Sequence, residues 1–303
     1  YILIIYICFI YHNANANWQK SDNNLNTQQS VVSQETPNTQ QDSLPSGVTK
    51  DWLNKITDER GNRILPEEEP VTDALQQNIF DGDVIGINYG KSVSSAGDVN
   101  GDGFDDIIIG DPNGNGGGGT NSGRAYIYYG GTVINSTADI ILTGETVNNY
   151  FGSSVSNAGD VNSDGYDDVI VGAYGYNSFT GRSYIYFGGA SMNNVADVIM
   201  TGAFTNNEFG KSVSGAGDVN NDGFSDVIVG AYAASVYTGK AYIYYGGSSM
   251  NNTSDVIMTG ESENHYFGGS VSSAGDVNGD GYDDVIVGAY GYSSYIGRAY
   301  IYF

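Results

Sequence analysis

The chain has 303 residues and carries 11 Lys and Arg against 35 Asp and Glu, a formal net charge of −24 at pH 7. This balance disfavours nucleic acid and anionic membranes as partners, because proteins that bind them need basic patches, and it favours cation binding. The single cysteine, Cys8, excludes an internal disulfide. With only two histidines, His12 and His265, the chain also argues against a cysteine- or histidine-based catalytic or zinc site. Forty-four glycines and 25 tyrosines predict tight turns between aromatic-rich strands.

The chain begins with an apolar run, Tyr1–Tyr11, that is too short to span a bilayer. It ends near Ala14-Asn15-Ala16, and small residues at this spacing are typical of a signal-peptide cleavage site. Residues 1–16 are therefore predicted to be a signal peptide clipped at its front, which makes the chain a fragment of an exported protein. The alternative is a buried strand or an anchoring helix.

Residues 17–70 are rich in Asn, Gln, Ser and Thr and show no apolar period, so they are predicted to be a low-complexity linker. Within it, residues 51–56 are expected to form a short helix that Asp51 caps. The prolines at Pro66 and Pro70 end any element that precedes them.

Residues 71–303 contain a repeated unit, with repeats over about 83–144, 145–202, 203–260 and 261–303. The third repeat reads "FGKSVSGAGDVNNDGFSDVIVGAY", then "TGKAYIYYGG", then "SDVIMTG". Four short strands in about 60 residues are typical of a β-propeller blade. The segments "DVIVG" and "AYIYY" are apolar or aromatic on both faces, as a sheet stacked between two other sheets requires. The sequence thus predicts an all-β propeller of four-stranded blades.

The two ends of the repeat region bear on how the ring closes. Asn78–Gly82 resembles a lone fourth strand, because Gly82 precedes Tyr89 by seven residues, as Gly144 precedes Phe151 in the next repeat. The sequence stops at Ala299–Phe303, a third strand whose fourth is missing. The segment Asn78–Gly82 could supply the missing fourth strand of the last blade and so close a four-bladed ring. We favour the alternative, in which the visible repeats form an open arc of a larger ring.

Each repeat carries a nine-residue acidic loop: "DVNGDGFDD", "DVNSDGYDD", "DVNNDGFSD" and "DVNGDGYDD". Positions 1, 3, 5 and 9 always bear a side-chain oxygen, position 6 is Gly, and position 7 is an aromatic residue that can offer its backbone carbonyl. Five hard oxygen donors, completed by a bidentate carboxylate or water, suit Ca²⁺ better than Mg²⁺. The candidate ligands are Asp98, Asn100, Asp102, Phe104 and Asp106; Asp160, Asn162, Asp164, Tyr166 and Asp168; Asp218, Asn220, Asp222, Phe224 and Asp226; and Asp276, Asn278, Asp280, Tyr282 and Asp284.

This pattern predicts about four Ca²⁺ ions, one per loop. An EF-hand or a dockerin would need an acidic residue at position 12, which is Ile109, Val171, Val229 or Val287 here. Position 8 varies between Asp and Ser and is left out of the ligand set. The alternative is an ordinary Asp/Asn/Gly turn, which four copies with fixed positions disfavour.

The repeats resemble the FG-GAP repeats of integrin alpha-chain propellers and of many exported microbial proteins. The "FG" pairs begin at Phe151, Phe209 and Phe267, with Tyr89-Gly90 in the first repeat, and "GAP" is replaced by "GAY" or by "GDP" at Gly110–Pro112. The resemblance implies a seven-bladed propeller with Ca²⁺ between the first and second strands of a blade. It implies a role in extracellular recognition or cell adhesion, and it transfers no catalytic residue.

We therefore expect a secreted or cell-surface calcium-binding propeller that is not an enzyme and that binds an extracellular protein or glycan. No transmembrane segment is predicted. Two alternatives stay open: an accessory propeller of a secreted carbohydrate-active hydrolase or lyase, and a structural surface spacer. Tyrosine-rich loops at 174–179, 232–237 and 290–295 are expected at one rim, where they pack between blades or contact a partner.

Overall fold

The computed structural model describes residues 78–82 and 88–303. Contacts divide the chain into Tyr1–Ala74 and Leu75–Phe303, and every described residue belongs to the second unit. The predicted signal peptide, the linker over 17–70 and the short helix over 51–56 lie outside the described residues.

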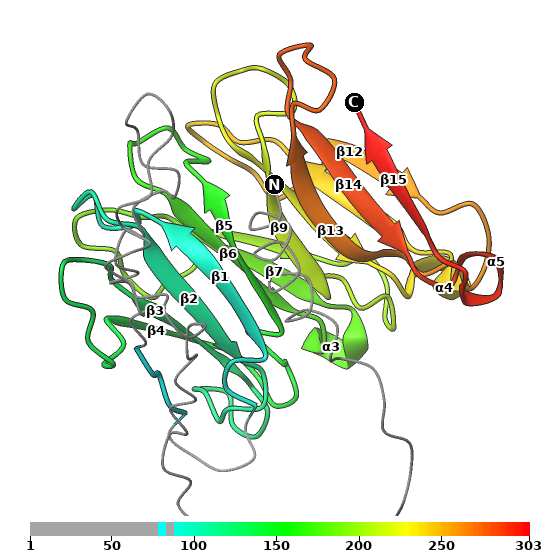
Figure 1. Ribbon diagram of the computed structural model, residues 1–303. Helices are drawn as coiled ribbons and strands as arrows, with labels where there is room; N and C mark the ends of the chain where they lie inside the picture. The colour runs from blue at the N-terminus through cyan, green and yellow to red at the C-terminus, as the bar shows by residue number, and fades with distance from the viewer. Residues whose placement is uncertain (1–77, 83–87) are drawn as a thin grey trace, which may run out of the picture. The chain divides into compact units, whose positions relative to one another are not determined.

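Four antiparallel sheets follow one another along the chain (Figure 1), each with its strands in sequence order. The first contains β1 (Ser92–Gly97), β2 (Asp106–Asp111), β3 (Arg124–Tyr128) and β4 (Ile140–Thr143). The second contains β5 (Ser154–Gly159), β6 (Asp168–Ala173), β7 (Arg182–Tyr186) and β8 (Val198–Thr201). The third contains β9 (Ser212–Gly217), β10 (Asp226–Ala231), β11 (Lys240–Tyr244) and β12 (Val256–Thr259). The fourth has three strands, β13 (Phe267–Gly275), β14 (Asp284–Ala289) and β15 (Arg298–Tyr302). The all-β blade architecture expected from the sequence is confirmed.

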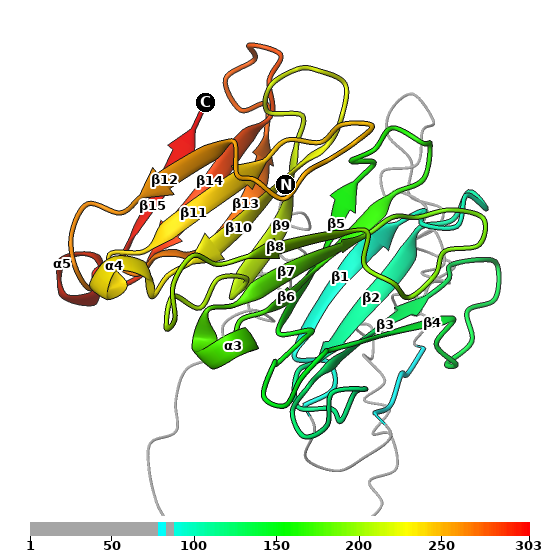
Figure 2. The same cartoon turned by 180° about the vertical axis from the view of Figure 1, so that it is seen from behind.

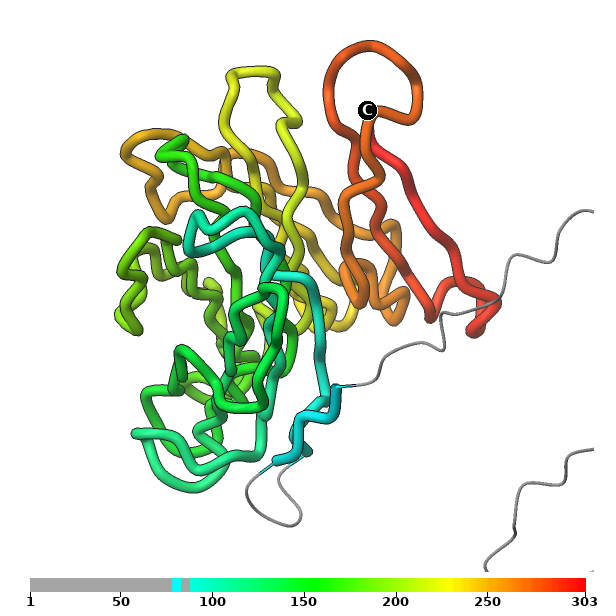
Figure 3. The backbone as a smooth tube through the Cα atoms, turned by 60° about the vertical axis from the view of Figure 1, so that its left-hand side comes forward, coloured from blue at the N-terminus to red at the C-terminus, as the bar shows by residue number. Residues whose placement is uncertain are grey.

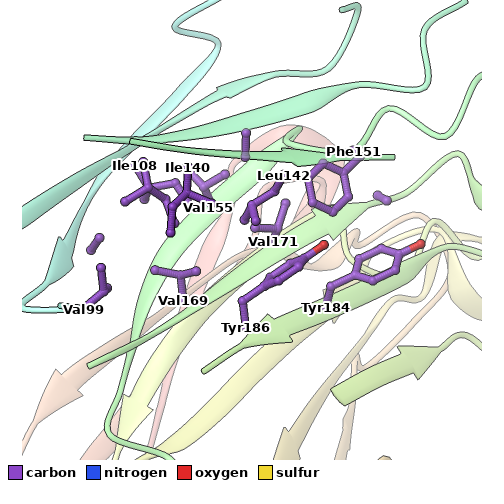
Figure 4. Packing of buried hydrophobic residues seen from close by; sticks show 14 residues of the cluster. Val99, Ile108, Ile140, Leu142, Phe151, Val155, Val169, Val171, Tyr184 and Tyr186 are labelled. Atoms are coloured by element: carbon purple, nitrogen blue, oxygen red, sulfur yellow. The ribbon is translucent and has the colours of Figure 1, made fainter. Parts of the chain in front are cut away.

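The sheets pack face to face, which explains why their second strands are apolar on both sides. Every residue of β6 and of β10 is buried. In contrast, buried and exposed residues alternate along β4, an outer strand with one face in water. Figure 4 shows the core between the first two sheets, where Ile108 and Leu142 face Val171 and Tyr186.

The first strands of the four sheets lie next to one another in sequence order, β1 beside β5, β5 beside β9 and β9 beside β13. Because neighbouring strands are antiparallel, the loops after the first and third strands of each sheet lie at one end of the sheets. We call this end the acidic-loop end. The loops after the second strands, and the connections between sheets, lie at the opposite end, which we call the tyrosine end (Figure 2 and Figure 3).

Three single turns, α3 (Tyr176–Phe179), α4 (Ala234–Tyr237) and α5 (Tyr292–Tyr295), join second to third strands at the tyrosine end. In α4, Ser235, Val236 and Tyr237 have φ values of 53°, 56° and 60°. Left-handed backbone is rare for a β-branched residue such as Val236, and it is strained unless its surroundings enforce it. The sequence alone indicated only variable loops here.

The segment Asn78–Gly82 differs from its prediction, since the structure assigns no strand to it. A fourth strand forms beside the third strand of its own sheet, and no described strand pairs with this segment. Gly82 nevertheless takes the expected place: a Cβ atom added to it would lie 2.7 Å from Tyr89 Cβ, as one on Gly144 would lie 2.8 Å from Phe151 Cβ.

Candidate metal centre

The first residue of each acidic loop organises the backbone that follows it. Asp98 Oδ1 accepts hydrogen bonds from the N–H groups of Gly101 at 2.8 Å and Asp102 at 3.0 Å, and Asp98 Oδ2 accepts one from Gly103 at 2.8 Å. Asp276 makes the same three bonds in the fourth loop, and they lower its pKa, the bond from Gly281 most of all. Hydrogen bonds from the backbone thus favour the charged form of Asp276.

Positions 3 and 5 bring further oxygens to the same side of the loop. Asn100 Oδ1 accepts the Asp102 N–H at 2.8 Å, the same group that Asp98 Oδ1 binds, so these two side-chain oxygens lie close together. Asn100 Nδ2 in turn donates to Asp102 Oδ2 at 3.1 Å. The second and fourth loops repeat the Asn–Asp contact at 3.0 Å and 2.9 Å.

Position 9 opens the second strand of each sheet and is buried. Asp106 is 0% exposed, and its two carboxylate oxygens accept the N–H groups of Val99 at 2.9 Å and Gly130 at 2.7 Å. Asp168 and Asp226 have equivalent pairs of backbone donors. Asp284 differs, because its Oδ2 accepts the Val277 N–H while its buried Oδ1 has no hydrogen-bond partner among the described residues.

Burial opposes the charged form of three of these carboxyls, Asp106, Asp168 and Asp226. Burial raises the pKa of Asp168 to about 7, and the carboxylates at positions 1 and 5 of its loop raise it further against two backbone hydrogen bonds. Burial likewise raises the pKa of Asp226 to about 6 and that of Asp106 above its ordinary value. A carboxyl with a raised pKa destabilises the folded chain above its unfolded pKa, unless a cation offsets the charge.

The donor set of each loop fits a hard cation, since it contains only carboxylate, amide and carbonyl oxygens. Within 78–82 and 88–303, however, no three His, Cys, Asp or Glu side chains form a ready metal-binding group. Positions 1, 3 and 5 gather together, whereas both oxygens of position 9 accept backbone N–H groups in the first three loops, and one does so in the fourth. A carboxylate oxygen has two lone pairs, so one that accepts an N–H can also bind a cation.

Position 8, which is not among the predicted ligands, makes a specific contact in the second and fourth loops. Asp167 Oδ2 accepts the backbone N–H of Asp98, in the neighbouring loop, at 2.9 Å. The sequence feature that could have indicated this contact is the glycine before each loop. A residue with a side chain does not fit there, because a Cβ atom on Gly97 would lie 2.1 Å from Asp167 Oδ2.

The tyrosine end bears a row of aromatic rings across neighbouring sheets. Tyr150 stacks on Tyr174 with centroids 5.1 Å apart, and Tyr266 stacks on Tyr290 at 4.8 Å. Lys211 Nζ lies 3.5 Å from the centroid of the Tyr174 ring. The rings thus pack on one another, as expected, and part of the row also faces solvent. The Lys and Arg residues between 88 and 303 all lie at this end, where they begin a third strand or directly precede a first strand: Lys91, Arg124, Arg182, Lys211, Lys240 and Arg298.

The repeats match a known family model. The model described as FG-GAP repeat matches residues 89–128, 151–186, 209–244 and 267–302. The chain is 38% identical to integrin alpha-5 of Xenopus laevis over 106 residues, which cover 34% of this chain and 10% of that protein. It is 35% identical to integrin alpha-6 of Homo sapiens over 141 residues, 43% of this chain and 12% of that protein. The matched part spans about a tenth of the length of these relatives.

Successive antiparallel sheets, each with an acidic loop after its first strand, define a repeat protein built from β-propeller blades. The chain is an FG-GAP repeat protein, and its repeats resemble the propeller of integrin alpha chains. Among its described helices, none is long and apolar enough to cross a membrane.

Proposed function

We propose that this chain is an exported, calcium-binding β-propeller that acts in extracellular recognition or cell adhesion. The observation that carries the proposal is the fourfold recurrence of one loop, with the same residue types at the candidate ligand positions, apart from Phe or Tyr at position 7, and with hydrogen bonds from the N–H groups of positions 5 and 6 to the position-1 carboxylate each time. Ordinary turns tolerate exchange among Asp, Asn, Ser and Gly, whereas a cation cage needs an oxygen at each ligand position. The similarity to integrin alpha chains supports the adhesive role.

In each loop the carboxylates at positions 1, 5 and 9, the amide at position 3 and the backbone carbonyl at position 7 would hold one Ca²⁺. In the first loop these are Asp98, Asp102, Asp106, Asn100 and Phe104, and the other loops follow the same pattern. When bound, the ion offsets the loop's negative charge and cross-links the first strand to the second. The protein positions the oxygens. Three backbone N–H groups donate hydrogen bonds to Asp98 and fix the turn, and burial holds Asp106 at the start of β2.

We propose the tyrosine end as the surface that meets a partner protein or glycan. Tyr290 is 51% exposed and Tyr295 is 68% exposed, and large aromatic rings are rigid contacts for protein and sugar surfaces. The strained turns α3, α4 and α5 support this view, because strain that surroundings must hold is concentrated at functional sites. The acidic clusters repeat at equivalent positions in every sheet, which suits a structural role rather than a single catalytic centre.

Calcium titration of the chain by calorimetry tests the metal proposal directly. We expect saturable binding near about four ions and a higher melting temperature in Ca²⁺ than in EDTA. Mg²⁺ at the same concentration serves as the control, and it should raise the melting temperature less. If neither saturable heat nor a shift in melting temperature is found, the loops are plain acidic turns and the calcium proposal is wrong.

A further inference from the structure

Neighbouring acidic loops are joined directly by hydrogen bonds that involve position 8. Asp167 Oδ2 accepts the Asp98 N–H at 2.9 Å, and the Asp167 N–H donates to the Asp98 carbonyl at 3.2 Å. The same reciprocal pair joins Asp283 to Asp218, at 2.9 Å and 3.1 Å. Position 8 stands between the proposed ligands at positions 7 and 9 of its own loop, and it binds position 1 of the preceding loop.

The residue before each loop makes room for this contact. A Cβ atom on Gly97 would lie 2.1 Å from Asp167 Oδ2 and 2.6 Å from Asp167 Cβ, and one on Gly217 would meet Asp283 in the same way. Gly275 holds the equivalent place before the fourth loop and has no atom within 4 Å of such a Cβ. The close approach of this glycine to position 8 of the next loop is therefore found where another described sheet follows.

A second path joins the buried carboxylates of adjacent sheets. Asp168 Oδ1 accepts the Gly188 N–H at 2.8 Å, and the next residue, Gly189, donates its N–H to the Val99 carbonyl at 2.8 Å. Val99 then donates its own N–H to Asp106 Oδ2 at 2.9 Å. The backbone of one turn thus links position 9 of the second loop to position 9 of the first.

This second path is repeated between the second and third loops. Asp226 Oδ1 accepts the Gly246 N–H at 2.8 Å, the Gly247 N–H donates to the Val161 carbonyl at 2.7 Å, and the Val161 N–H donates to Asp168 Oδ2 at 2.8 Å. The side-chain contact is not repeated there. Ser225 replaces Asp at position 8, and although its N–H donates to the Asp160 carbonyl at 3.1 Å, its hydroxyl makes no hydrogen bond to Asp160 within the described residues.

We propose that Asp167 and Asp283 couple cation binding in adjacent loops, so that filling one loop raises the affinity of its neighbour. The first loop is coupled to the second and the third to the fourth, whereas Ser225 leaves the second and third loops without the side-chain contact and therefore more weakly coupled, through the path between Asp168 and Asp226 and the Ser225 N–H bond. A cation in the first loop fixes the backbone of Asp98, which holds Asp167 and therefore the ligands on either side of it, Tyr166 and Asp168. By linkage, a cation in the second loop favours binding in the first to the same degree. This inference rests on the proposed calcium function.

Hydrogen exchange of the full chain, followed loop by loop across a Ca²⁺ titration, tests the coupling. Asp102→Asn weakens the first loop, and we expect it to raise the Ca²⁺ midpoint for protection of residues 160–168 by about fivefold, the lower end of the usual range of coupling between two sites. When Asp167→Ser is also present, the first-loop change should move that midpoint by less than about twofold. Serine is the natural residue at this position in the third loop, so the variant retains a side chain that the fold accepts.

Three further variants sharpen the test. Asp167→Asn keeps an oxygen acceptor and should preserve the coupling. Asp105→Ala is the matched control, because Asp105 is exposed, holds position 8 of the first loop and has no side-chain hydrogen bond to another described residue. Ser225→Asp should make the second loop sensitive to mutation of the third.

The outcomes separate the two proposals. If the unaltered chain shows no Ca²⁺-dependent protection in any loop, the calcium proposal fails and the coupling fails with it. If protection is found but the midpoint of the second loop ignores Asp102→Asn, or still responds to it when Asp167→Ser is present, only the coupling is wrong.

Discussion

Phe151 packs edge-on against Tyr184, with ring centroids 5.3 Å apart, and thereby joins the start of one sheet to the third strand of that sheet. The pair recurs as Phe209 with Tyr242 at 5.4 Å and Phe267 with Tyr300 at 5.3 Å. Each of these Phe side chains is almost fully buried, and each lies beside the glycine that ends the preceding fourth strand. The Phe of each "FG" pair therefore packs between two consecutive sheets and stabilises their contact.

Replacing one of these rings should weaken the stack of sheets. We expect Phe209→Ala to lower the free energy of unfolding by about 3–5 kcal/mol, because it removes a buried ring and leaves a cavity. Urea denaturation followed by far-UV circular dichroism measures the change. Phe204→Ala is the control, since Phe204 is 71% exposed, and it should stay within about 0.5 kcal/mol. Equal losses in the two variants would contradict the packing role.

Sequence periodicity sufficed to predict the blades because each strand has a local signature that repeats. "DVIVGA" is apolar on both faces and is buried throughout in β6 and β10, and the spacing of the repeats gave the number of sheets. The candidate ligands at positions 1, 3 and 5 could also be predicted to gather, because side chains two residues apart in a tight loop point to one side.

Contacts between sheets could not be predicted in this way. The partner of Asp167 is the backbone of Asp98, 69 residues earlier, and no local pattern indicates that pairing. The left-handed turns were missed for a related reason: "ASVY" contains no glycine to signal positive φ, and the backbone contacts of the turn come from residues distant in sequence, such as the Asn264 N–H that donates to the Val236 carbonyl. The backbone partners of Asp106 were missed too, because Gly130 belongs to a turn after the third strand.

The distinction between positions 5 and 8 of one loop gives a clean test of the ligand assignment. Asp102→Ala should abolish one bound Ca²⁺, because it removes a carboxylate that lies beside Asn100. Asp105→Ala removes an exposed carboxylate from the same loop and should leave the number of bound ions unchanged. Native mass spectrometry counts the ions, and calorimetry gives the affinity. Loss of an ion in both variants would mean that position 8 also binds the cation.

Two glycines with the same backbone conformation separate backbone strain from contact between sheets. Gly97 and Gly275 have φ values of 74° and 65°, so an alanine at either position carries a left-handed penalty of about 1–2 kcal/mol. Gly97→Ala should cost more than Gly275→Ala, because the added methyl group would also meet Asp167 Cβ at 2.6 Å, which rotation of the carboxylate cannot relieve. Thermal unfolding in EDTA measures both variants without bound metal. Similar melting temperatures would show that the two loops can separate freely.

The tyrosine end should affect recognition more than stability. Tyr295 is 68% exposed, so Tyr295→Ala should change the free energy of unfolding by less than about 0.5 kcal/mol. Combined with Tyr290→Ala, it should lower binding to an immobilised panel of matrix proteins and glycans by about tenfold or more, because exposed aromatic rings dominate contact surfaces. Val195→Ala is the matched control, since Val195 is also 68% exposed and lies in the loop between β7 and β8, at the acidic-loop end. If the double tyrosine variant binds as well as this control, the partner meets another face of the sheets and the proposed recognition surface is wrong.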